Sequence, residues 1–365
     1  MVQRLKFDTQ VINNMTKILS SMYEESRIYN YANFVTIKGV DKQLLFELCI
    51  IMDGSNSDAM MRLKVPYDGG DFDPLIIHFG EFAKVMKRIK DPMVELVVEE
   101  KSLTIETNSF KHTLELSTIK IPNAIYNKLG SFLDTSRDKL LDFNLLKLYN
   151  VLSNVGSVLG SMTLNRMFYG MYAWDKYVIA SNGLVASYDR SYSFPTPFLF
   201  PKATIGILKE LPKLGAKYAI AHNTFYLVGQ GFECYIGEWY VEPDYGTNTG
   251  YPIKAMDKKI EELESNSILI PNGKEVFESI RACQGFAEAS YTYLGLGYTS
   301  NANGSHIDRF EAVEGFGDKR FILSRDVTTG ISRIDSMRVS KDFGMVMVEI
   351  GEQKLMLVCM KDEVN

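Results

Sequence analysis

The sequence predicts an α+β protein made of three similar domains, each with antiparallel sheets and two helices. One order of elements recurs three times: an apolar strand, a short helix with a basic outer face and a tight β-hairpin. The helices of these copies open near Gly80, Pro201 and Ser324, about 120 residues apart, which indicates repeated domains rather than a short solenoid repeat. Helices segregated to one face of antiparallel sheets are typical of the α+β class. The expected domains span 1–126, 127–253 and 254–365.

The first domain shows the repeated order most clearly. Residues 7–22 are expected to pass from a strand into a helix. The helix near Gly80 has an apolar stripe at helical spacing, formed by Phe82, Val85, Met86 and Ile89. Three basic residues project together from its other side, namely Lys84, Lys87 and Arg88. The expected strands are Phe34–Ile37, Leu44–Met52, Leu75–Phe79, Met93–Val98, Leu103–Thr107 and Phe110–Leu116.

The second domain repeats this order after a linker predicted at Asn123–Asp142. A helix is expected over Asn144–Leu159, with Asn144 as its N-cap. A second helix is expected to start at Pro201, because proline suits a first helical turn, and to end at Pro212. The expected strands are Met167–Ala173, Tyr177–Ala180, Val185–Tyr188, Phe198–Phe200, Lys217–Ala221, Phe225–Gly229 and Phe232–Trp239.

The third domain follows a linker at Pro243–Pro252 and a charged stretch at Lys254–Glu264. Helices are expected over Lys274–Ala287 and from Ser324. The expected strands are Tyr291–Thr299, Ile307–Val313, Arg338–Ser340, Met345–Ile350 and Lys354–Met360.

Composition indicates a folded protein. Of the 365 residues, 46% are hydrophobic and 23% are charged, which is typical of a globular chain. The sequence has neither an apolar run near the roughly 20 residues that cross a bilayer nor a secretory signal at its start. Four cysteines lie in apolar patterns and are expected to be buried free thiols in a reducing compartment. We therefore expect a cytoplasmic protein with no membrane partner.

The charge distribution points to nucleic acid even though the net charge is −5. The predicted helix windows are basic as a group, whereas the rest of the chain is acidic, and the field near a surface follows this arrangement. Such lysines and arginines bind the phosphate backbone of duplex DNA without sequence preference. The residues expected to face DNA are Lys17, Lys84, Lys87, Arg88, Lys147, Lys202, Lys209, Lys213, Arg281, Arg325 and Arg333.

Motifs for catalysis are absent from the sequence. The four histidines are scattered and match no zinc signature, and the acidic loop Asp53–Asp58 lacks the ligand spacing of a calcium loop. No phosphate-cradling glycine loop and no nucleophile–base pair is evident. We therefore expect a binding protein that is not an enzyme and has no metal or cofactor.

Four stretches resemble bacterial DNA sliding clamps, the β subunits of DNA polymerase III, or their phage and mobile-element relatives. Tyr177–Ala186 is similar to a strand–turn segment that usually reads Ala-Thr-Asp-Gly-x-Arg-Leu. Cys234–Tyr245 is similar to a stretch ending in Phe-Pro-Asp-Tyr, and Lys354–Lys361 to a final strand ending in Met-Pro-Met-Arg. Pro74–Pro122 follows the strand–helix–hairpin order of the family. The chain departs from the pattern at Asn182–Ala186 and at Cys359, where the family has a proline.

The resemblance implies a head-to-tail homodimer, a ring of six domains whose helices line a channel around duplex DNA. A closed ring holds DNA by topology, so weak contacts permit sliding while a polymerase stays tethered. Polymerases and the clamp loader would bind through short linear peptides, and the departures favour a partner with its own motif. The implied peptide pocket comprises Phe168, Ser181, Gly183, Ala186, Pro243, Tyr245, Met356, Val358 and Met360. The implied dimer contact pairs Leu114 and Leu116 of one copy with Cys283 and Phe286 of the other.

Two other functions stay open at this point. The weak charge of the third repeat and the altered pocket are compatible with a non-replicative interaction scaffold that keeps the fold without encircling DNA. The aromatic stretches Tyr291–Tyr298 and Gly231–Tyr251 are the only features that favour a small-molecule enzyme.

Overall fold

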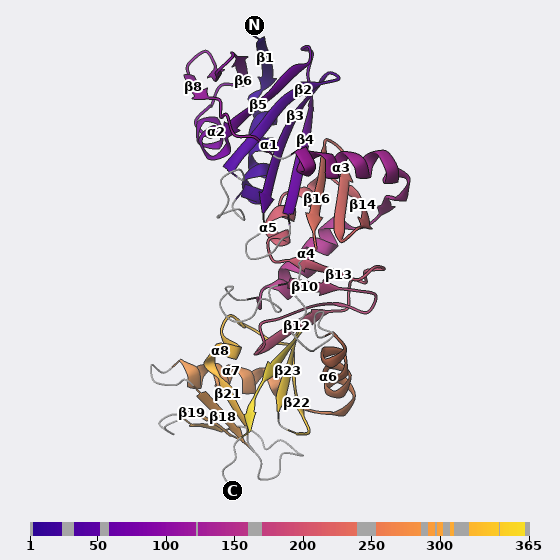
Figure 1. Cartoon of the computed structure of the whole chain (residues 1–365). Coiled ribbons are helices and arrows are strands. Elements are labelled where there is room, and N and C mark those ends of the chain that lie inside the picture. Colours follow the sequence, from indigo (N-terminus) through magenta and orange to yellow (C-terminus); the bar gives the residue numbers. More distant parts are fainter. Residues whose placement is uncertain are drawn as a thin grey trace. The chain divides into compact units, whose positions relative to one another are not determined.

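The computed structural model describes residues 3–23, 33–51, 58–121, 123–159, 170–238, 253–285, 291–295, 298–301, 307–309, 321–342 and 344–361. The chain divides into two compact units, which Figure 1 colours by sequence. The N-terminal unit contains Met1–Asn150 and Phe198–Tyr240, and the C-terminal unit contains Val151–Pro197 and Val241–Asn365. Each unit includes part of the predicted middle domain, and the division into three domains stays a prediction.

The N-terminal unit is built from two antiparallel sheets. Its helices are α1 (Thr9–Tyr23), α2 (Phe79–Met86), α3 (Asn123–Ser136), the start of α4 (Leu145–Gly156) and α5 (Thr204–Leu208). The smaller sheet has the order β1-β6-β7-β8, with β1 (Gln3–Asp8), β6 (Met93–Val98), β7 (Ser102–Glu106) and β8 (Lys111–Glu115).

The larger sheet of this unit joins strands from distant parts of the sequence, in the order β5-β2-β3-β4-β16-β15-β14-β9. These strands are β2 (Phe34–Val40), β3 (Gln43–Ile51), β4 (Asp58–Pro66), β5 (Phe72–His78), β9 (Leu141–Asp142), β14 (Ala216–Ala221), β15 (Thr224–Gly229) and β16 (Phe232–Gly237); β13 (Phe198–Pro201) also belongs to this unit. Pairing of β4 with β16 places Arg62 opposite Glu233.

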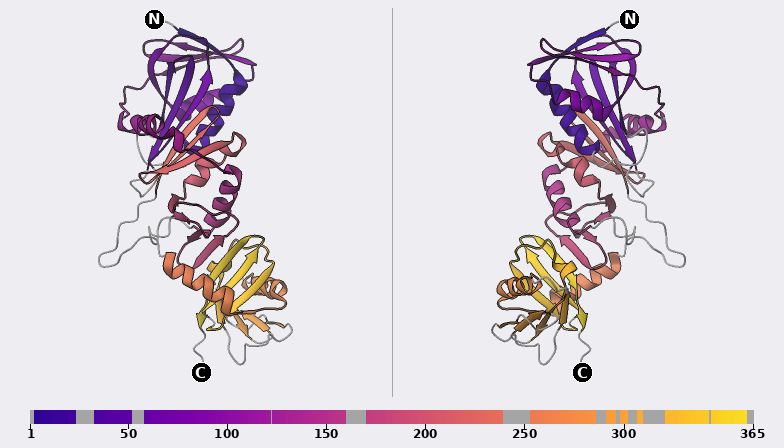
Figure 2. Two further views of the ribbon diagram at one scale, coloured as in Figure 1. Left: turned by 90° about the vertical axis from the view of Figure 1, so that its right-hand side faces the viewer. Right: turned by 90° about the vertical axis from the view of Figure 1, so that its left-hand side faces the viewer.

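Helices cover both faces of the larger sheet. Figure 2 shows α1 and α3 on opposite sides of its strands. On the α1 side, Phe46 and Phe82 are almost fully buried. On the α3 side, Phe132 stacks on Tyr226 with ring centroids 3.7 Å apart. The core of the unit therefore has two layers, one beneath each helical cover.

The C-terminal unit also has two antiparallel sheets. One contains, in order, β10 (Gly170–Ala173), β11 (Val178–Ser181), β12 (Val185–Asp189), β24 (Gln353–Val358), β23 (Met345–Ile350), β22 (Ser336–Ser340) and β17 (Ser267–Leu269). The other has the order β20-β19-β18-β21-β25, with β18 (Tyr291–Gly295), β19 (Tyr298–Asn301), β20 (Ile307–Arg309), β21 (Phe321–Ser324) and β25 (Met360–Lys361). Helices α6 (Ile253–Asn266), α7 (Gly273–Gln284) and α8 (Arg325–Thr328) complete it, and Phe277, Ile280 and Leu357 lie in its core.

Several local predictions are confirmed. The apolar stripe of α2 is buried, with Phe82 1% exposed and Met86 0% exposed. Asn144 caps α4, because its side-chain oxygen accepts a hydrogen bond from the Lys147 backbone N–H at 2.9 Å. The predicted strands Lys217–Ala221 and Phe225–Gly229 are β14 and β15, and the two residues between the observed strands, His222 and Asn223, both have positive φ, as this hairpin turn requires.

Other predictions are wrong. Residues 123–136 form α3 rather than a linker, because Leu129 and Phe132 give this polar stretch an apolar side that packs on the sheet. Pro201 ends β13 and the helix starts only at Thr204. The stretch Tyr291–Thr299 is two strands of a hairpin rather than one strand. The predicted linker Pro243–Pro252 lies outside the described residues.

Candidate functional site

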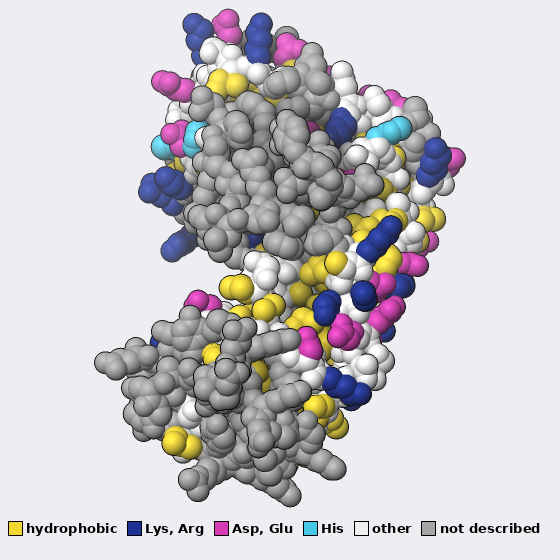
Figure 3. Space-filling view, turned by 60° about the horizontal axis from the view of Figure 1, so that its bottom comes forward, with side chains coloured by type: hydrophobic (Ala, Val, Ile, Leu, Met, Phe, Trp, Pro, Cys, Tyr) yellow, Lys and Arg dark blue, Asp and Glu magenta, His cyan; other side chains and the backbone are white. Residues whose placement is uncertain are grey.

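The N-terminal unit carries a basic face made by three helices. α1 contacts both α2 and α5, so the three lie side by side. The exposed basic residues on and just after these helices are Lys17, Lys84, Lys87, Arg88, Lys209 and Lys213. We call this set the basic helix face. Figure 3 shows a group of lysine and arginine side chains on the left flank of this unit.

Local folding explains why α2 presents its cations to solvent. His78 caps the helix by accepting a hydrogen bond from the Glu81 backbone N–H. The buried stripe then fixes the rotation of the helix, which turns Lys84, Lys87 and Arg88 outward. Within the described part of the chain these three cations have no ion-pair partner, so their charge is not neutralised locally.

Three other predicted DNA-facing residues in this unit differ from that group. Lys17 forms an ion pair with Glu210 at 2.9 Å, which links α1 to the end of α5 and offsets one charge. Lys202 is only partly exposed and interacts with other residues. Lys147 is exposed at the first turn of α4. The free positive charge of this face therefore comes mainly from α2.

In the C-terminal unit, two of the predicted DNA-facing arginines lie together. Arg281 at the end of α7 and Arg325 at the start of α8 line one pocket of about 260 Å³. The Arg281 guanidinium donates a hydrogen bond to the Ser332 carbonyl at 2.7 Å, which holds it beside the pocket. Gln284 forms part of the lining and accepts a hydrogen bond from Thr328. Arg333 is exposed outside this lining.

The predicted peptide pocket is described in part, around the turn between β11 and β12. The Asn182 side-chain oxygen accepts hydrogen bonds from the Leu184 and Val185 backbone N–H groups at 2.9 and 2.8 Å. The Ser181 hydroxyl donates to the Val185 carbonyl and accepts from the Gly183 N–H, both at 3.1 Å. Gly183 has a φ of 92°, which favours glycine. These contacts make a rigid turn that presents Leu184.

Leu184 and Val358 form an exposed apolar pair beside this turn. Val358 on β24 donates its backbone N–H to the Leu184 carbonyl at 3.0 Å. The side chains are 49% and 43% exposed. Leu184 was not among the predicted pocket residues, although an apolar residue directly after Asn-Gly in a turn is a usable signal.

The remaining predicted pocket residues do not add to this exposed surface. Ser181, Ala186 and Met356 are buried, at 5%, 7% and 5% exposure, and support the sheet from within. Phe168, Pro243 and Tyr245 lie outside the described residues, as does the side chain of Met360.

A polar network on α6 holds the strands behind the turn. The Tyr188 hydroxyl donates to Glu264 at 2.9 Å, and Lys354 and Arg190 pair with the same carboxylate at 3.1 and 2.7 Å. Burial, together with the neighbouring Glu264 charge, raises the pKa of Tyr188, so its hydroxyl stays a hydrogen-bond donor. These contacts anchor both β12 and β24 to α6.

Two of the residues predicted for the dimer contact are buried inside their own units. Leu114 is 4% exposed and Cys283 is 0% exposed, with the Cys283 thiol directed at Thr299. Those two side chains are therefore not available to a second copy, because they already fill cores. Leu116 is partly exposed, and Phe286 lies outside the described residues. The edge of β8 is the surface that remains for such a contact.

Other kinds of site were also sought in the described segments. They hold no group of three or more His, Cys, Asp or Glu side chains placed to bind a metal. None of their helices is long and apolar enough to span a membrane.

Comparison with known proteins identifies the fold. No protein-family model matches the chain, and no curated protein matches its sequence. Solved structures match over nearly the whole length. The β subunit of DNA polymerase III from Thermotoga maritima is 12% identical, with a TM-score of 0.71 over 99% of this chain and 100% of that one. The β subunit from Pseudomonas aeruginosa is 10% identical, with a TM-score of 0.70 over the same shares.

A third match is the Helicobacter pylori β clamp bound to a DNA ligase peptide. It is 14% identical, with a TM-score of 0.64 over 98% of this chain and 100% of that one. The chain thus has the sliding-clamp fold, as the resemblance in its sequence predicted.

Proposed function

We propose that this chain is a DNA sliding clamp: two copies close head to tail around duplex DNA and tether a DNA polymerase and other partners. The main support is the match of nearly the whole chain to sliding-clamp structures. The basic helix face adds the chemistry that such a role needs. Apart from Lys17, its lysines and arginines have no ion-pair partner among the described residues, so they attract phosphates, and such contacts are weak enough to permit sliding.

The exposed pair Leu184–Val358 supports a second part of the proposal. An extended partner peptide gains affinity from an apolar anchor seated on a rigid surface, and this pair sits on a hydrogen-bonded turn. A clamp structure of the same fold binds a DNA ligase peptide. We infer that polymerase and loader peptides bind this chain at Leu184 and Val358.

Retention on DNA tests the proposal. A circular plasmid is incubated with the protein at high concentration, washed in high salt and then cut once. The expected result is retention on the circle and release on cutting, because topology rather than affinity holds the ring. Light scattering after size exclusion should give a dimer. A protein that stays monomeric, or that the circle never retains, would contradict the clamp.

The DNA-facing role of α2 is tested by the triple variant Lys84→Ala, Lys87→Ala, Arg88→Ala. Three lost phosphate contacts should reduce the slope of log affinity against log salt by about 3 on a linear fragment. The matched control replaces three exposed lysines outside the basic helix face, Lys42, Lys120 and Lys139, with alanine. Equal slopes for the two triple variants would show that the loss reflects total charge alone.

One observation favours the alternative scaffold function. In the C-terminal unit, α7 carries Lys274 and Arg281 against Glu275 and Glu278, and α8 carries Arg325 against Asp326. These two helices are therefore neutral overall, whereas α2 together with the two residues after it has a net charge of +2, from Lys84, Lys87 and Arg88 against Glu81. If the wild-type chain is dimeric and binds peptides but is never retained on circular DNA, the scaffold replaces the clamp.

A further inference from the structure

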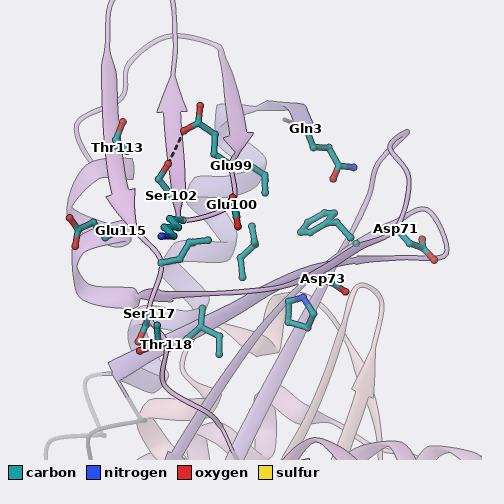
Figure 4. Close-up of a pocket in the computed structure, with 18 of the residues that line it drawn as sticks. Gln3, Asp71, Asp73, Glu99, Glu100, Ser102, Thr113, Glu115, Ser117 and Thr118 are labelled. Carbon is teal, nitrogen blue, oxygen red and sulfur yellow. Dashed lines mark hydrogen bonds between the residues drawn. The ribbon is translucent and has the colours of Figure 1, made fainter. Parts of the chain in front are cut away.

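Two hollows of the described surface are already accounted for. Figure 4 shows the larger one, a groove of about 1430 Å³ that is lined in part by Thr113 and Glu115 of β8. It adjoins the strand edge that remains for contact with a second copy, so it belongs to the proposed ring closure. In the hollow beside α6, the cations Lys176 and Arg190 already pair with carboxylates of that helix.

The pocket between α7 and α8 differs from both, because its charge is positive and unpaired. Arg281 and Arg325 line it, and none of the described residues around it is acidic. In the part of the chain that the structure describes, neither arginine has an ion-pair partner. The two helices are otherwise neutral overall, so the pocket concentrates positive charge at one point. This arrangement favours a single anionic group over a long charged surface.

Hydrogen bonds hold the two sides of this pocket together. Gln284 at the end of α7 is 5% exposed and accepts a hydrogen bond from the hydroxyl of Thr328 on α8. The Arg281 guanidinium donates one hydrogen bond to the Ser332 carbonyl at 2.7 Å. A guanidinium has five N–H donors, so others remain for a ligand. The pocket is therefore preformed, which lowers the entropy lost when a ligand binds.

The size and the charge of the pocket favour a phosphate group. Its volume of about 260 Å³ is below the roughly 300–1,000 Å³ of most small-molecule sites, so it fits a single group rather than a whole nucleotide. Gly285 and Gly330 line it without side chains that would fill it. The guanidinium fork matches the oxygens of phosphate. Two forks without an acid suit a group with about two negative charges, which a phosphate monoester carries at pH 7.

A terminal phosphate fits this site better than a phosphate within the DNA backbone. A backbone phosphate has one charge and a sugar on each side, whereas a monoester has about −1.5 to −2 and one free side. Bidentate contacts to every backbone phosphate would also oppose sliding. We propose that the pocket of Arg281 and Arg325 binds the terminal phosphate of a DNA strand. The choice of DNA as the source of this phosphate rests on the proposed clamp function.

The test compares two single-stranded DNA probes on the full-length chain. Both have the same twelve-nucleotide sequence with fluorescein at the 3′ end, and only one has a 5′-phosphate. Fluorescence anisotropy should show that the wild-type chain binds the phosphorylated probe at least about tenfold tighter, because charge-assisted hydrogen bonds are gained. The double variant Arg281→Gln, Arg325→Gln should reduce this preference below about twofold, because the guanidinium forks are lost.

The matched control is Lys274→Gln, Arg333→Gln, which removes the same charge at exposed positions of the same unit outside the pocket. It should weaken the binding of both probes alike and leave the preference unchanged. Equal loss of preference in the two double variants, or no preference in the wild-type chain, would overturn the proposal. Should the variant of both arginines fail to fold by circular dichroism, Arg325→Gln alone serves the same comparison.

Competition and the retention test separate the remaining outcomes. At constant ionic strength, inorganic phosphate should weaken binding of the phosphorylated probe more than that of the other. A phosphoserine peptide that displaces this probe better than an unlabelled phosphorylated strand would overturn the assignment to DNA. The uncut plasmid circle has no strand end, so retention on it does not depend on this pocket. Retention without a phosphate preference contradicts the pocket alone, and a preference without retention contradicts the clamp alone.

Discussion

Two sheets of this protein each join strands from distant parts of the sequence, and the two joints differ in where their charged side chains lie. In the N-terminal unit β4 pairs with β16, and a row of buried charges runs across the joint. In the C-terminal unit β12 pairs with β24. The pairs near one end are small or apolar, such as Ala186 and Met356, whereas Tyr188 faces Lys354 and Asp189 faces Gln353 at the other end. The comparison separates a joint that is closed to partners from one that is open to them.

The charged joint centres on Arg62. Its guanidinium lies 2.6 Å from Glu47 on β3 and 3.0 Å from Glu233 on β16. Lys38 pairs with Glu47 at 2.9 Å, and Lys64 pairs with Glu233, so the cations and anions alternate across four strands. Both carboxylates are nearly inaccessible, at 1% and 2% exposure. All five groups are paired only in this register, so the row selects it as well as joining the strands.

In the β12–β24 joint, the charged contacts lie on the side of the sheet that faces α6. Glu264 on α6 holds Tyr188 of β12 and Lys354 of β24 from that side. The strand ends are then free to carry Leu184 and Val358 in solvent. Because Glu264 holds β12 and β24 from one side, the end of this joint with Leu184 and Val358 stays open to a ligand. In the β4–β16 joint, by contrast, the charged side chains are already engaged in ion pairs with one another.

The largest expected effect comes from breaking the charged row. Arg62→Met should lower the free energy of unfolding by about 3–5 kcal/mol, because two buried carboxylates lose their shared partner. Urea unfolding followed by circular dichroism measures the change. The control is the triple replacement Glu47→Gln, Arg62→Met, Glu233→Gln, which removes the charges together and should cost less than Arg62→Met alone. A single variant as stable as wild type would mean that the row contributes nothing to the fold.

That row also shows where sequence-based prediction stops. β4 was not predicted, since Arg62 and Lys64 look like solvent-facing residues, and nothing local reveals that their side chains are only 14% and 26% exposed. Their partner Glu233 is about 170 residues away in the sequence. Only the ion pairs formed in the folded protein offset the free energy lost when these charges leave water. By contrast, the stripe of α2 and the bounds of β6 and β23 follow from local periodicity and were predicted.

The candidate site divides in the same way. The exposure of Lys84, Lys87 and Arg88 could be predicted, because their i, i+3, i+4 spacing places them together on the side of the helix opposite its apolar stripe. Arg281 on α7 and Arg325 on α8 line the same pocket, but the strands β18–β21 lie between these two helices in the sequence. The pocket could therefore not be predicted from the sequence. Leu184 was overlooked because its apolar neighbour Val358 comes from β24, at the far end of the chain, and only the fold brings the two together.

The next effect in size tests the open joint. The double variant Leu184→Asp, Val358→Asp should weaken binding of peptides selected from a displayed random library on the wild-type chain by at least tenfold, because the apolar anchor is lost. Its free energy of unfolding should stay within about 0.5 kcal/mol of wild type, since both side chains are already exposed.

Leu269→Asp is the control for this variant, because Leu269 is also 49% exposed in the same unit but lies on β17. It should leave peptide affinity unchanged. Equal loss in the two variants would remove the distinction drawn between the two joints.

The smallest expected effect concerns acid and the attachment of α6. Burial of Asp257 opposes its ionisation, but hydrogen bonds from Lys176 at 2.7 Å and Tyr177 at 2.9 Å prevail and hold the pKa of this carboxyl below its ordinary value. A carboxyl with a lowered folded-state pKa stabilises the fold above its unfolded value near 3.9, and this stabilisation is lost as pH falls through the folded pKa.

Because Lys176 is exposed and Asp257 is partly exposed, the loss should be under about 1 kcal/mol. Asp257→Asn should reduce stability slightly at pH 7 and flatten its decline between about pH 4 and pH 2, as measured by urea unfolding at each pH. The charged row in the N-terminal unit provides the contrast, since its carboxylates Glu47 and Glu233 are only 1% and 2% exposed. If Asp257→Asn leaves the acid profile of the chain unchanged, the contacts of Asp257 do not hold α6 to β11, and the apolar joint depends on Glu264 alone.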